Sequence, residues 1–290
     1  MPEGSSEGEG RHVRIDDTRL WVVERGDGFP LLILHGGPGL DHHEFADHLD
    51  PLGDRYRLVL VDQRSQGRSD PTPVSTWTLE RMAQDVIMLA RAMGLERYAV
   101  LGHSYGAFVA LQNALDYPGM AAGTIVSCGV ASSRWFAATD ELIRTFEPAW
   151  LRQQIIDSWE RETSVATVED LQALTDEQWP FHFADPLDPR IEGFAEASKG
   201  VLAPDVLRHF SKEGVGGIEV EDRLGEIAQP VLVLAGRHDR TCVVGASESM
   251  AAGIPGAELV VFEQSGHMPF VEEPEAYLAA VRAFLDRVAE

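Results

Sequence analysis

Apolar and polar positions along this chain follow two different rhythms. From residue 12 to 130, and again from 223 to 290, short apolar runs alternate with segments whose apolar residues recur every three or four positions. The short runs are HVRID, RLWVVERG, PLLILHG, RLVLVDQ, RYAVLGH, GTIVSCG, PVLVLAG and AELVVF. Strands and helices that alternate in this way form a mostly parallel sheet covered by helices. We therefore predict an α/β fold built on a mostly parallel eight-stranded sheet.

The strand pattern disappears between residues 131 and 222. This stretch is rich in Trp, Phe, Glu and Asp at helix-like spacings, as in ELIRTFEPAWLRQQIIDSWERE. Both flanks are needed to complete one sheet, so the stretch is an insertion. We predict a helical cap, or lid, over residues 131–222, inserted into a core made of residues 12–130 and 223–290.

The N-terminus and the cysteines limit where the protein acts. Residues 1–11 are rich in Gly, Ser and Glu and lack the basic and apolar regions of a secretory signal, so we expect a flexible tail. Apolar runs are far shorter than the roughly 20 residues that span a bilayer. We expect a cytoplasmic protein with no membrane partner. Cys128 and Cys242 form no C-x-x-C pattern, so two buried thiols are expected rather than a disulfide framework or a zinc site.

The chain is strongly acidic. Its 290 residues carry a formal net charge of −23, with lysine only at Lys199 and Lys212. Such a surface repels polyphosphate backbones and anionic lipids, so we expect no nucleic-acid partner. The charge either helps attract a cationic substrate or serves solubility alone, and the sequence leaves both open.

A serine stands at a tight corner in VLGHSYGAFVAL, residues 100–111. The segment before Ser104 is strand-like and the segment after it is helix-like. Gly102 and Gly106 leave no Cβ where the chain turns, which lets the serine hold a strained backbone that exposes its oxygen. Backbone N–H groups at the helix start lie beside that oxygen. We therefore predict that Ser104 is a nucleophile rather than part of a structural turn.

A serine nucleophile needs a base and a group that orients the base. His267 follows the last strand-like run and Asp239 follows the run before it, so both fall at the same sheet edge as Ser104. The order Ser, Asp, His, each after a strand, fits this architecture. His238 could compete with Asp239 but lies one residue nearer the strand, whereas His42, His43 and His48 need no function. We predict Ser104, Asp239 and His267 as a catalytic triad.

A second glycine-rich loop follows residues 31–34 and reads His35-Gly-Gly-Pro-Gly39. Glycine lets a backbone N–H approach an oxygen closely, and proline stiffens the loop. We predict an oxyanion hole made by the N–H groups of Gly37 and Tyr105. Dinucleotide binding is the competing interpretation of such a loop, but G-x-G-x-x-G is absent. The chemistry needs no metal or organic cofactor.

Together these segments resemble the α/β-hydrolase fold, and in detail the proline iminopeptidase family of serine peptidases. The resemblance is carried by HGGPG at 35–39, DQRSQGRSD at 62–70, GHSYG at 102–106, GRHD at 236–239 and SGH at 265–267. Family members usually have Gly where this chain has Ser65, and often Trp where it has Tyr105. Asp62 and Arg64 are expected to brace their loop rather than to react.

The resemblance implies an acyl-enzyme mechanism and a cap whose carboxylates bind the free α-amine of the substrate. A buried ammonium needs such partners. One sequence does not show which cap residue faces the pocket, so none is singled out among Glu141, Glu147, Glu160, Glu162, Glu192, Glu196 and Glu213, or among Trp135, Trp150, Trp159 and Trp179.

Three functions remain open, and each takes a small molecule or a short peptide. The first is an aminopeptidase or amidase that releases an N-terminal proline or another small residue. The second is a carboxylesterase or lactonase with the same triad. The third is a catalytically silent binding protein, against which the intact triad argues. The oligomeric state is not predicted.

Overall fold

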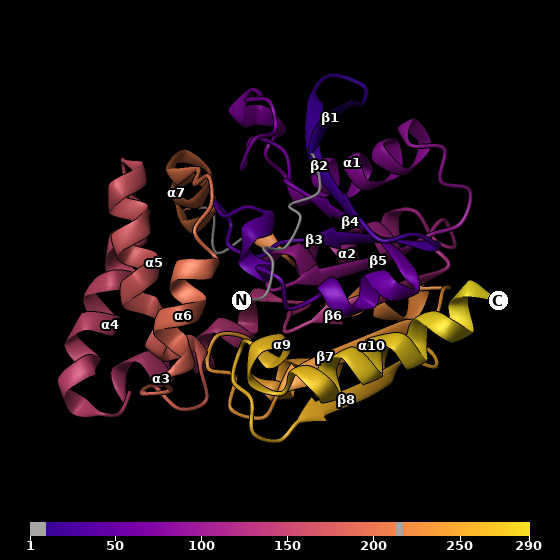
Figure 1. Cartoon of the computed structure of the whole chain (residues 1–290). Coiled ribbons are helices and arrows are strands. Elements are labelled where there is room, and N and C mark those ends of the chain that lie inside the picture. Colours follow the sequence, from indigo (N-terminus) through magenta and orange to yellow (C-terminus); the bar gives the residue numbers. More distant parts are fainter. Residues whose placement is uncertain (1–9, 213–216) are drawn as a thin grey trace, which may run out of the picture.

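The protein is described by a computed structural model for residues 10–212 and 217–290 (Figure 1). Within these ranges one eight-stranded sheet has the order β1-β2-β4-β3-β5-β6-β7-β8. The pairs β1–β2 and β2–β4 are antiparallel, and the other five pairs are parallel. The strands are β1 (Arg11–Arg14), β2 (Arg19–Arg25), β3 (Phe29–Leu34), β4 (Tyr56–Val61), β5 (Ala99–His103), β6 (Gly123–Ser127), β7 (Val231–Gly236) and β8 (Glu258–Phe262). The predicted α/β fold with a mostly parallel eight-stranded sheet is confirmed.

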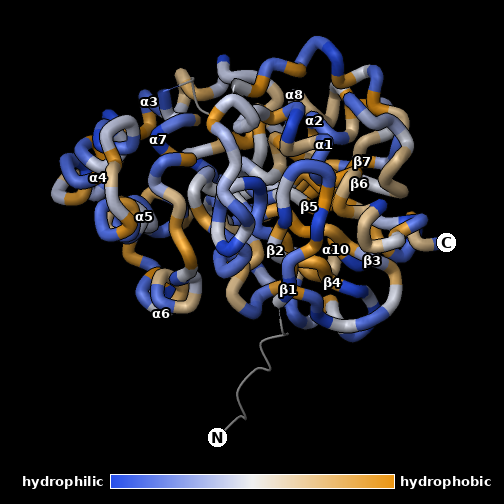
Figure 2. Tube along the Cα trace, turned by 90° about the horizontal axis from the view of Figure 1, so that it is seen from above, coloured by the Kyte–Doolittle hydropathy of each residue, from blue (hydrophilic) through white to orange (hydrophobic). Residues whose placement is uncertain are grey.

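The central strands are buried on both faces, as their unbroken apolar runs predict. Every residue of β5, β6 and β7 is buried. One face packs against α1 (Leu79–Ala92), α2 (Tyr105–Asp116) and α8 (Val244–Gly253). The other face packs against α10 (Pro274–Ala289), the long yellow helix beside β7 and β8 in Figure 1. Figure 2 shows the hydrophobic strands lying between these layers. The core therefore consists of two apolar layers separated by the sheet.

Between β6 and β7, the residues that the structure describes form five α-helices, which lie together beyond one end of the sheet (Figure 1). They are α3 (Phe136–Arg144), α4 (Ala149–Arg161), α5 (Val168–His182), α6 (Arg190–Ala197) and α7 (Pro204–Lys212). Small apolar clusters join α3, α4, α5 and α7, and one of these clusters contains Ile143, Phe146, Leu151, Ile155 and Phe181. We call residues 131–222 the cap, following the predicted boundaries.

The two ends of the cap lie side by side. Ser132 and Glu219 form an isolated β-bridge, and the Ser132 hydroxyl donates to the Glu219 carboxylate at 2.9 Å. The N–H of Val220 donates to the Ala131 carbonyl at 2.9 Å. The described residues also form short helical turns: η1 (His42–Phe45), η2 (Asp50–Asp54), η3 (Val74–Thr76), η4 (Ser133–Trp135), η5 (Glu162–Ser164), η7 (Glu221–Glu226) and α9 (Pro269–Glu272). The division into core and cap stays a prediction. The contact between the two ends of residues 131–222 is compatible with it.

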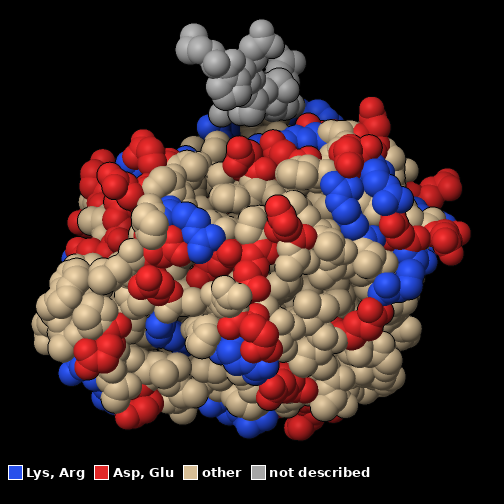
Figure 3. Space-filling model, turned by 60° about the horizontal axis from the view of Figure 1, so that its bottom comes forward, with Lys and Arg blue, Asp and Glu red and all other residues tan. Residues whose placement is uncertain are grey.

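The structure bears in part on the expected N-terminal tail, on membrane-spanning helices and on the distribution of surface charge. Of the expected N-terminal tail, residues 1–9 lie outside the described residues, and Arg11 already belongs to β1. Across residues 10–212 and 217–290, every helix is too short or too polar to cross a bilayer. On the face shown in Figure 3, Lys and Arg side chains are interspersed with Asp and Glu rather than gathered into a basic patch.

Candidate active site

Ser104 occupies a strained corner between β5 and α2. Its backbone has φ 52° and ψ −117°, a region that non-glycine residues avoid at a cost of about 1–3 kcal/mol. A Cβ at Gly102 would lie 2.0 Å from the Gly106 carbonyl oxygen, and one at Gly106 would lie 2.2 Å from the Leu34 oxygen. Both glycines are therefore required by close backbone approach, and they hold the serine on the carboxyl side of the sheet.

Asp239 and His267 meet at the same edge. Asp239 follows β7, His267 follows β8, and the His267 Nδ1 lies 2.7 Å from Asp239 Oδ2. The other carboxylate oxygen accepts the N–H groups of Thr241 and Cys242, each at 2.8 Å. Because Nδ1 donates to a carboxylate, Nε2 is left as an acceptor. His238, the competing candidate beside Asp239, is exposed.

Ser104 and His267 line one cavity of about 160 Å³, together with Gly37 and Tyr105. In the described part of the chain, the Ser104 hydroxyl forms no hydrogen bond with His267. Such bonds are often long before a substrate binds. Within the same residues, neither Gly37 N–H nor Tyr105 N–H donates a hydrogen bond. Two unused N–H donors therefore border the cavity that contains the serine and the histidine.

The loop after β4 holds the glycine-rich loop after β3. The N–H of Gln63 donates to His35 Nε2 at 3.2 Å, and its side-chain amide donates to the His35 carbonyl at 2.7 Å. The His35 Nδ1 donates to the Gly36 carbonyl at 2.8 Å. The N–H of Gly39 donates to the Gln66 side chain at 2.6 Å. These bonds fix the peptide groups on both sides of Gly37, whose φ of 99° favours glycine.

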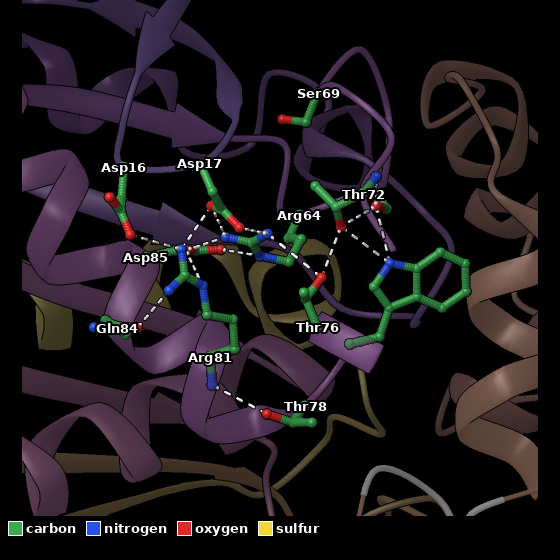
Figure 4. Close-up of polar contacts among 12 residues, drawn as sticks. Asp16, Asp17, Arg64, Ser69, Thr72, Thr76, Thr78, Arg81, Gln84 and Asp85 are labelled. Carbon is green, nitrogen blue, oxygen red and sulfur yellow. Dashed lines mark hydrogen bonds and ion pairs between the residues drawn. The ribbon is translucent and has the colours of Figure 1, made fainter. Parts of the chain in front are cut away.

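Arg64 braces the β4 loop from behind (Figure 4). Its guanidinium is buried and donates to both oxygens of Asp85, each at 2.7 Å, and to Asp17 at 2.9 Å. The hydrogen bond from Arg64 lowers the pKa of Asp17 to about 2. Arg64 is not among the residues that line the Ser104 cavity. A bracing role therefore fits Arg64, as the sequence suggests.

Ser65 departs from the glycine of the resembling family and has φ 60°. This left-handed conformation is one that glycine adopts without strain. The Ser65 hydroxyl bonds the Thr72 hydroxyl at 2.8 Å and accepts from the Thr72 N–H at 2.9 Å and the Trp77 indole at 3.0 Å. These bonds offset the backbone strain that the serine introduces.

Comparison with known proteins places the chain in a family. Residues 30–274 match the family model described as alpha/beta hydrolase fold. The chain belongs to the α/β-hydrolase family. It is 28% identical to a proline iminopeptidase of Heyndrickxia coagulans over 91% of this chain and 93% of that one. It is 29% identical to a proline iminopeptidase of Saccharolobus solfataricus, over 91% and 87% of the two chains.

Solved structures give the same result. The proline iminopeptidase of Mycobacterium smegmatis superposes with a TM-score of 0.76 at 26% identity, covering 97% of this chain and 99% of that one. An esterase of Exiguobacterium antarcticum has a TM-score of 0.76 at 23% identity over 96% and 99% of the two chains, which shows the shared fold alone. The resemblance to the proline iminopeptidase family is confirmed, and the protein is a hydrolase of the α/β-hydrolase fold.

One carboxylate of the cap, that of Glu162, lines the same cavity as Ser104. Glu162 lines the cavity and accepts hydrogen bonds from the Gln178 amide at 2.9 Å and the Ser211 hydroxyl at 3.2 Å. Burial raises its pKa to about 7. It forms no ion pair with any residue in the described ranges. The sequence contains no signal for Glu162, because its spacing resembles that of the other cap glutamates; Glu213 lies outside the described residues.

The cap is joined to the histidine loop through its own backbone. The N–H of His267 donates to the His182 carbonyl at 2.6 Å. The Arg240 guanidinium donates to the carbonyl groups of Phe181, Phe183 and Ala184. Arg240 directly follows the predicted acid, but sequence reasoning missed it because its acceptors are backbone atoms far along the chain.

Glu272 joins the same elements from the other side. Its carboxylate accepts from the N–H groups of Ala184, at 2.7 Å, and of Gly266, at 2.8 Å. Burial raises the pKa of Glu272 to about 7. The His182 ring also lines the cavity, and burial together with the nearby His267 lowers its pKa to about 4, so it is neutral at neutral pH.

Two groups of side chains have the spacing of metal ligands among the described residues. They are His103, Cys128 and His267, and Asp41, His42 and His43. In the first, His267 Nδ1 is engaged by Asp239. In the second, the Asp41 carboxylate accepts from the N–H of Val201 at 2.8 Å and from His43. Hydrogen bonds within the protein account for both groups.

Proposed function

We propose that this hydrolase acts through an acyl-enzyme, with Ser104 as nucleophile, His267 as general base and Asp239 as the residue that orients His267. The proposal is supported by the Asp239–His267 hydrogen bond and by the cavity that Ser104 and His267 share. The unused N–H groups of Gly37 and Tyr105 serve as the oxyanion hole. Donors of this kind stabilise the charge that develops in the transition state.

The reaction proceeds in two halves. Ser104 Oγ attacks the substrate carbonyl while its proton passes to His267 Nε2, and the oxyanion is bound by the two N–H groups. His267 then gives the proton to the leaving amine or alcohol. Water, deprotonated by the same imidazole, attacks the acyl-enzyme and releases the acid, and Ser104 regains its proton.

We infer an aminopeptidase or amidase of the proline iminopeptidase type, which releases an N-terminal proline or another small residue. One observation carries this inference: Glu162 is a carboxylate in the same cavity with neutral hydrogen-bond partners, and no Lys, Arg or His among residues 10–212 and 217–290 forms an ion pair with it. Carboxylates are rarely buried without a positive partner. The ammonium of a substrate with a free amine would supply that partner within the cavity that Glu162 shares with Ser104.

An esterase or lactonase is the second candidate. It is favoured by the mainly apolar wall of the cavity, which includes Leu40, Phe136, Ile143, Leu171, Leu174, Leu207, Phe210 and Met268. Its substrates would leave Glu162 protonated, a state that the raised pKa of this carboxyl makes accessible near neutral pH. The two candidate functions therefore differ in the protonation state of Glu162, which is ionised in the aminopeptidase and protonated in the esterase.

The test compares a proline amide, other aminoacyl amides and p-nitrophenyl esters as substrates of the wild type and three variants. Ser104→Ala should remove all turnover. Glu162→Gln keeps the shape of the side chain but removes its charge, so kcat/KM for aminoacyl amides should fall by about tenfold or more while ester turnover changes little. Glu160→Gln, an exposed neighbour in the same stretch, is the matched control and should change neither.

Two results would contradict the proposal. Ester turnover without any aminoacyl amide cleavage would leave the esterase and exclude the aminopeptidase. Turnover that survives Ser104→Ala would exclude the mechanism itself.

A further inference from the structure

A buried pair of ionisable side chains, Glu44 and His103, lies directly behind the nucleophile. His103 is the last residue of β5 and precedes Ser104, and Glu44 belongs to η1, which follows the glycine-rich loop. The exposed fraction is 0% for His103 and 4% for Glu44. His103 Nδ1 lies 3.1 Å from Glu44 Oε1. Neither residue has a role in the triad or the oxyanion hole.

The pair touches all three loops of the site. The other Glu44 oxygen accepts the Gly36 N–H at 2.5 Å, on the residue before Gly37. His103 Nε2 lies 2.9 Å from the backbone carbonyl of His267. A Cβ at Gly36 would lie 2.5 Å from the Glu44 carboxylate and 3.0 Å from the Ser104 Cβ, so the pair and the serine enclose this glycine.

The hydrogen-bond partners determine how many protons the pair holds. A backbone carbonyl can only accept, so His103 Nε2 carries a proton. Glu44 Oε2 already accepts from a backbone N–H, and Oε1 faces Nδ1. The 3.1 Å contact between Nδ1 and Oε1 therefore needs a proton of its own, on the imidazole or on the carboxyl. Either way the pair holds one proton more than a neutral histidine beside an ionised glutamate.

The surroundings favour keeping that proton. Burial opposes charge on both groups, but the Glu44 carboxylate raises the pKa of His103 and the His103 imidazolium lowers the pKa of Glu44. Burial keeps the Cys128 thiol and the Tyr277 phenol neutral by raising their pKa values. The other titratable groups that face the pair are His35, His182, Asp239 and His267.

We propose that Glu44 and His103 are positioning residues, and that the proton between them holds the Gly36–Gly37 peptide and the His267 loop in register with Ser104. This role rests on the proposed function of those residues. Removal of the proton would leave the lone pair of Nδ1 facing a carboxylate oxygen. The two groups would then repel each other, and the oxyanion loop and the histidine loop would lose their common anchor.

The role has a consequence at alkaline pH. The proton is retained above the pH at which an ordinary histidine loses it, and its loss lowers the reactivity of Ser104. A Gln at position 44 can accept from Gly36 N–H with its oxygen and donate to Nδ1 with its nitrogen, so Glu44→Gln keeps all three contacts without a titrating proton. The alkaline decline should therefore disappear in Glu44→Gln.

The first experiment detects the proton without any substrate. The full chain is labelled with ¹⁵N-histidine, and His103 is assigned by comparison with His103→Gln. At pH 7 we expect both ring nitrogens of His103 to be protonated, or Nδ1 to share a strongly downfield proton, and we expect this signal to be lost in Glu44→Gln. An imidazole with an unprotonated Nδ1 and no shared proton in the wild type would overturn the proposal.

The second experiment measures reactivity with an alkyl fluorophosphonate, which forms a bond with an activated serine and carries no titrating amine. Glu44→Ala should slow labelling by about tenfold or more, because small displacements of catalytic groups are costly. Glu44→Gln should be less impaired and should lack the alkaline decline. Glu24→Ala is the control, since it removes a carboxylate on β2 that pairs with Arg11 of β1 and Arg57 of β4 and does not line the cavity.

Each outcome decides a different point. Labelling of Glu44→Ala within twofold of Glu24→Ala, with both proteins folded by circular dichroism, would overturn the positioning role. An alkaline decline that is the same in Glu44→Gln and the wild type would overturn the role of the proton. A wild type that is never labelled would contradict the proposed function, and the NMR result would still confirm or overturn the shared proton.

Discussion

The catalytic edge of the core and the cap side of the cavity are held by different means. At the edge, Ser104 is fixed by backbone contacts that leave no room for a Cβ at Gly102 or Gly106. In the cap, Glu162 is held by two side chains, Gln178 and Ser211, on helical elements. Backbone contacts tolerate few substitutions, whereas side-chain contacts change with single residues. If the proposed roles of Ser104 and Glu162 hold, the reaction depends on the rigid sheet edge, and the choice of substrate depends on a few side chains of the cap.

The largest expected effect comes from the core. Asp239→Asn keeps the size of the side chain but favours the wrong imidazole tautomer, so the rate of fluorophosphonate labelling should fall by about 10⁴-fold. The folded content should stay unchanged by circular dichroism. A fall of less than about tenfold would show that Asp239 does not orient His267 and that the core is no more demanding than the cap.

The seam between the two regions should give the next largest effect. Arg240→Met removes a guanidinium that donates to three backbone carbonyl groups, and buried acceptors left unpaired cost about 1–3 kcal/mol each. We expect the free energy of unfolding to fall by about 3 kcal/mol, measured by urea denaturation. Arg237→Met, which removes a surface pair with Glu263, is the control and should cost less than about 1 kcal/mol. Equal losses would mean that Arg240 does not join cap to core.

The contribution of Glu162 to the free energy of unfolding should depend on pH. The folded protein holds the Glu162 proton more tightly than the unfolded chain, because burial raises the pKa from 4.5 to about 7. Stability from this group therefore falls as pH rises from about 4.5 to 7, and the full cost is present above 7. Glu162→Gln should stabilise the protein by about 2 kcal/mol at pH 8 and by much less at pH 5.

The measurement is thermal unfolding at the two pH values, with Glu160→Gln as control. A stabilisation by Glu162→Gln that is equal at pH 5 and pH 8 would show that the carboxylate is not strained by burial. If an amine substrate fills the site, it should stabilise the wild type more than the variant at pH 8.

The smallest effect probes the strained corner itself. Glycine adopts the φ of 52° at position 104 without strain, whereas alanine does not. Ser104→Gly should therefore be more stable than Ser104→Ala by about 1 kcal/mol, although both lack the proposed nucleophile. Equal unfolding temperatures would show that the backbone at this position relaxes freely.

Sequence reasoning reached the core because each predicted residue is tied to a strand end. Parallel strands bring the residues after them to one edge, so the positions of Ser104, Asp239 and His267 follow from order alone. Their catalytic roles stay predictions until the variants are measured. The pattern of apolar and polar positions also predicted the buried strands, and the glycines at 36, 37 and 39 marked the glycine-rich loop.

The same reasoning could not choose among the cap residues. Glu160 and Glu162 are two residues apart on one stretch, yet Glu160 is exposed and Glu162 lines the cavity. The difference arises because α4 ends at Arg161 and the chain continues as η5, and no local signal marks that change. The pairing of Glu44 with His103 was equally hidden, since the two residues are 59 positions apart and belong to different loops.

The bridge between Ser132 and Glu219 makes the chain leave the sheet and return to it at one place, although 87 positions separate the two residues. The entropic cost of closing a loop grows only slowly with its length, so a longer or shorter insertion between these two residues would change the stability of the sheet little. Protein engineers could cut there and splice in a foreign lid, and the strands on either side would not need to shift.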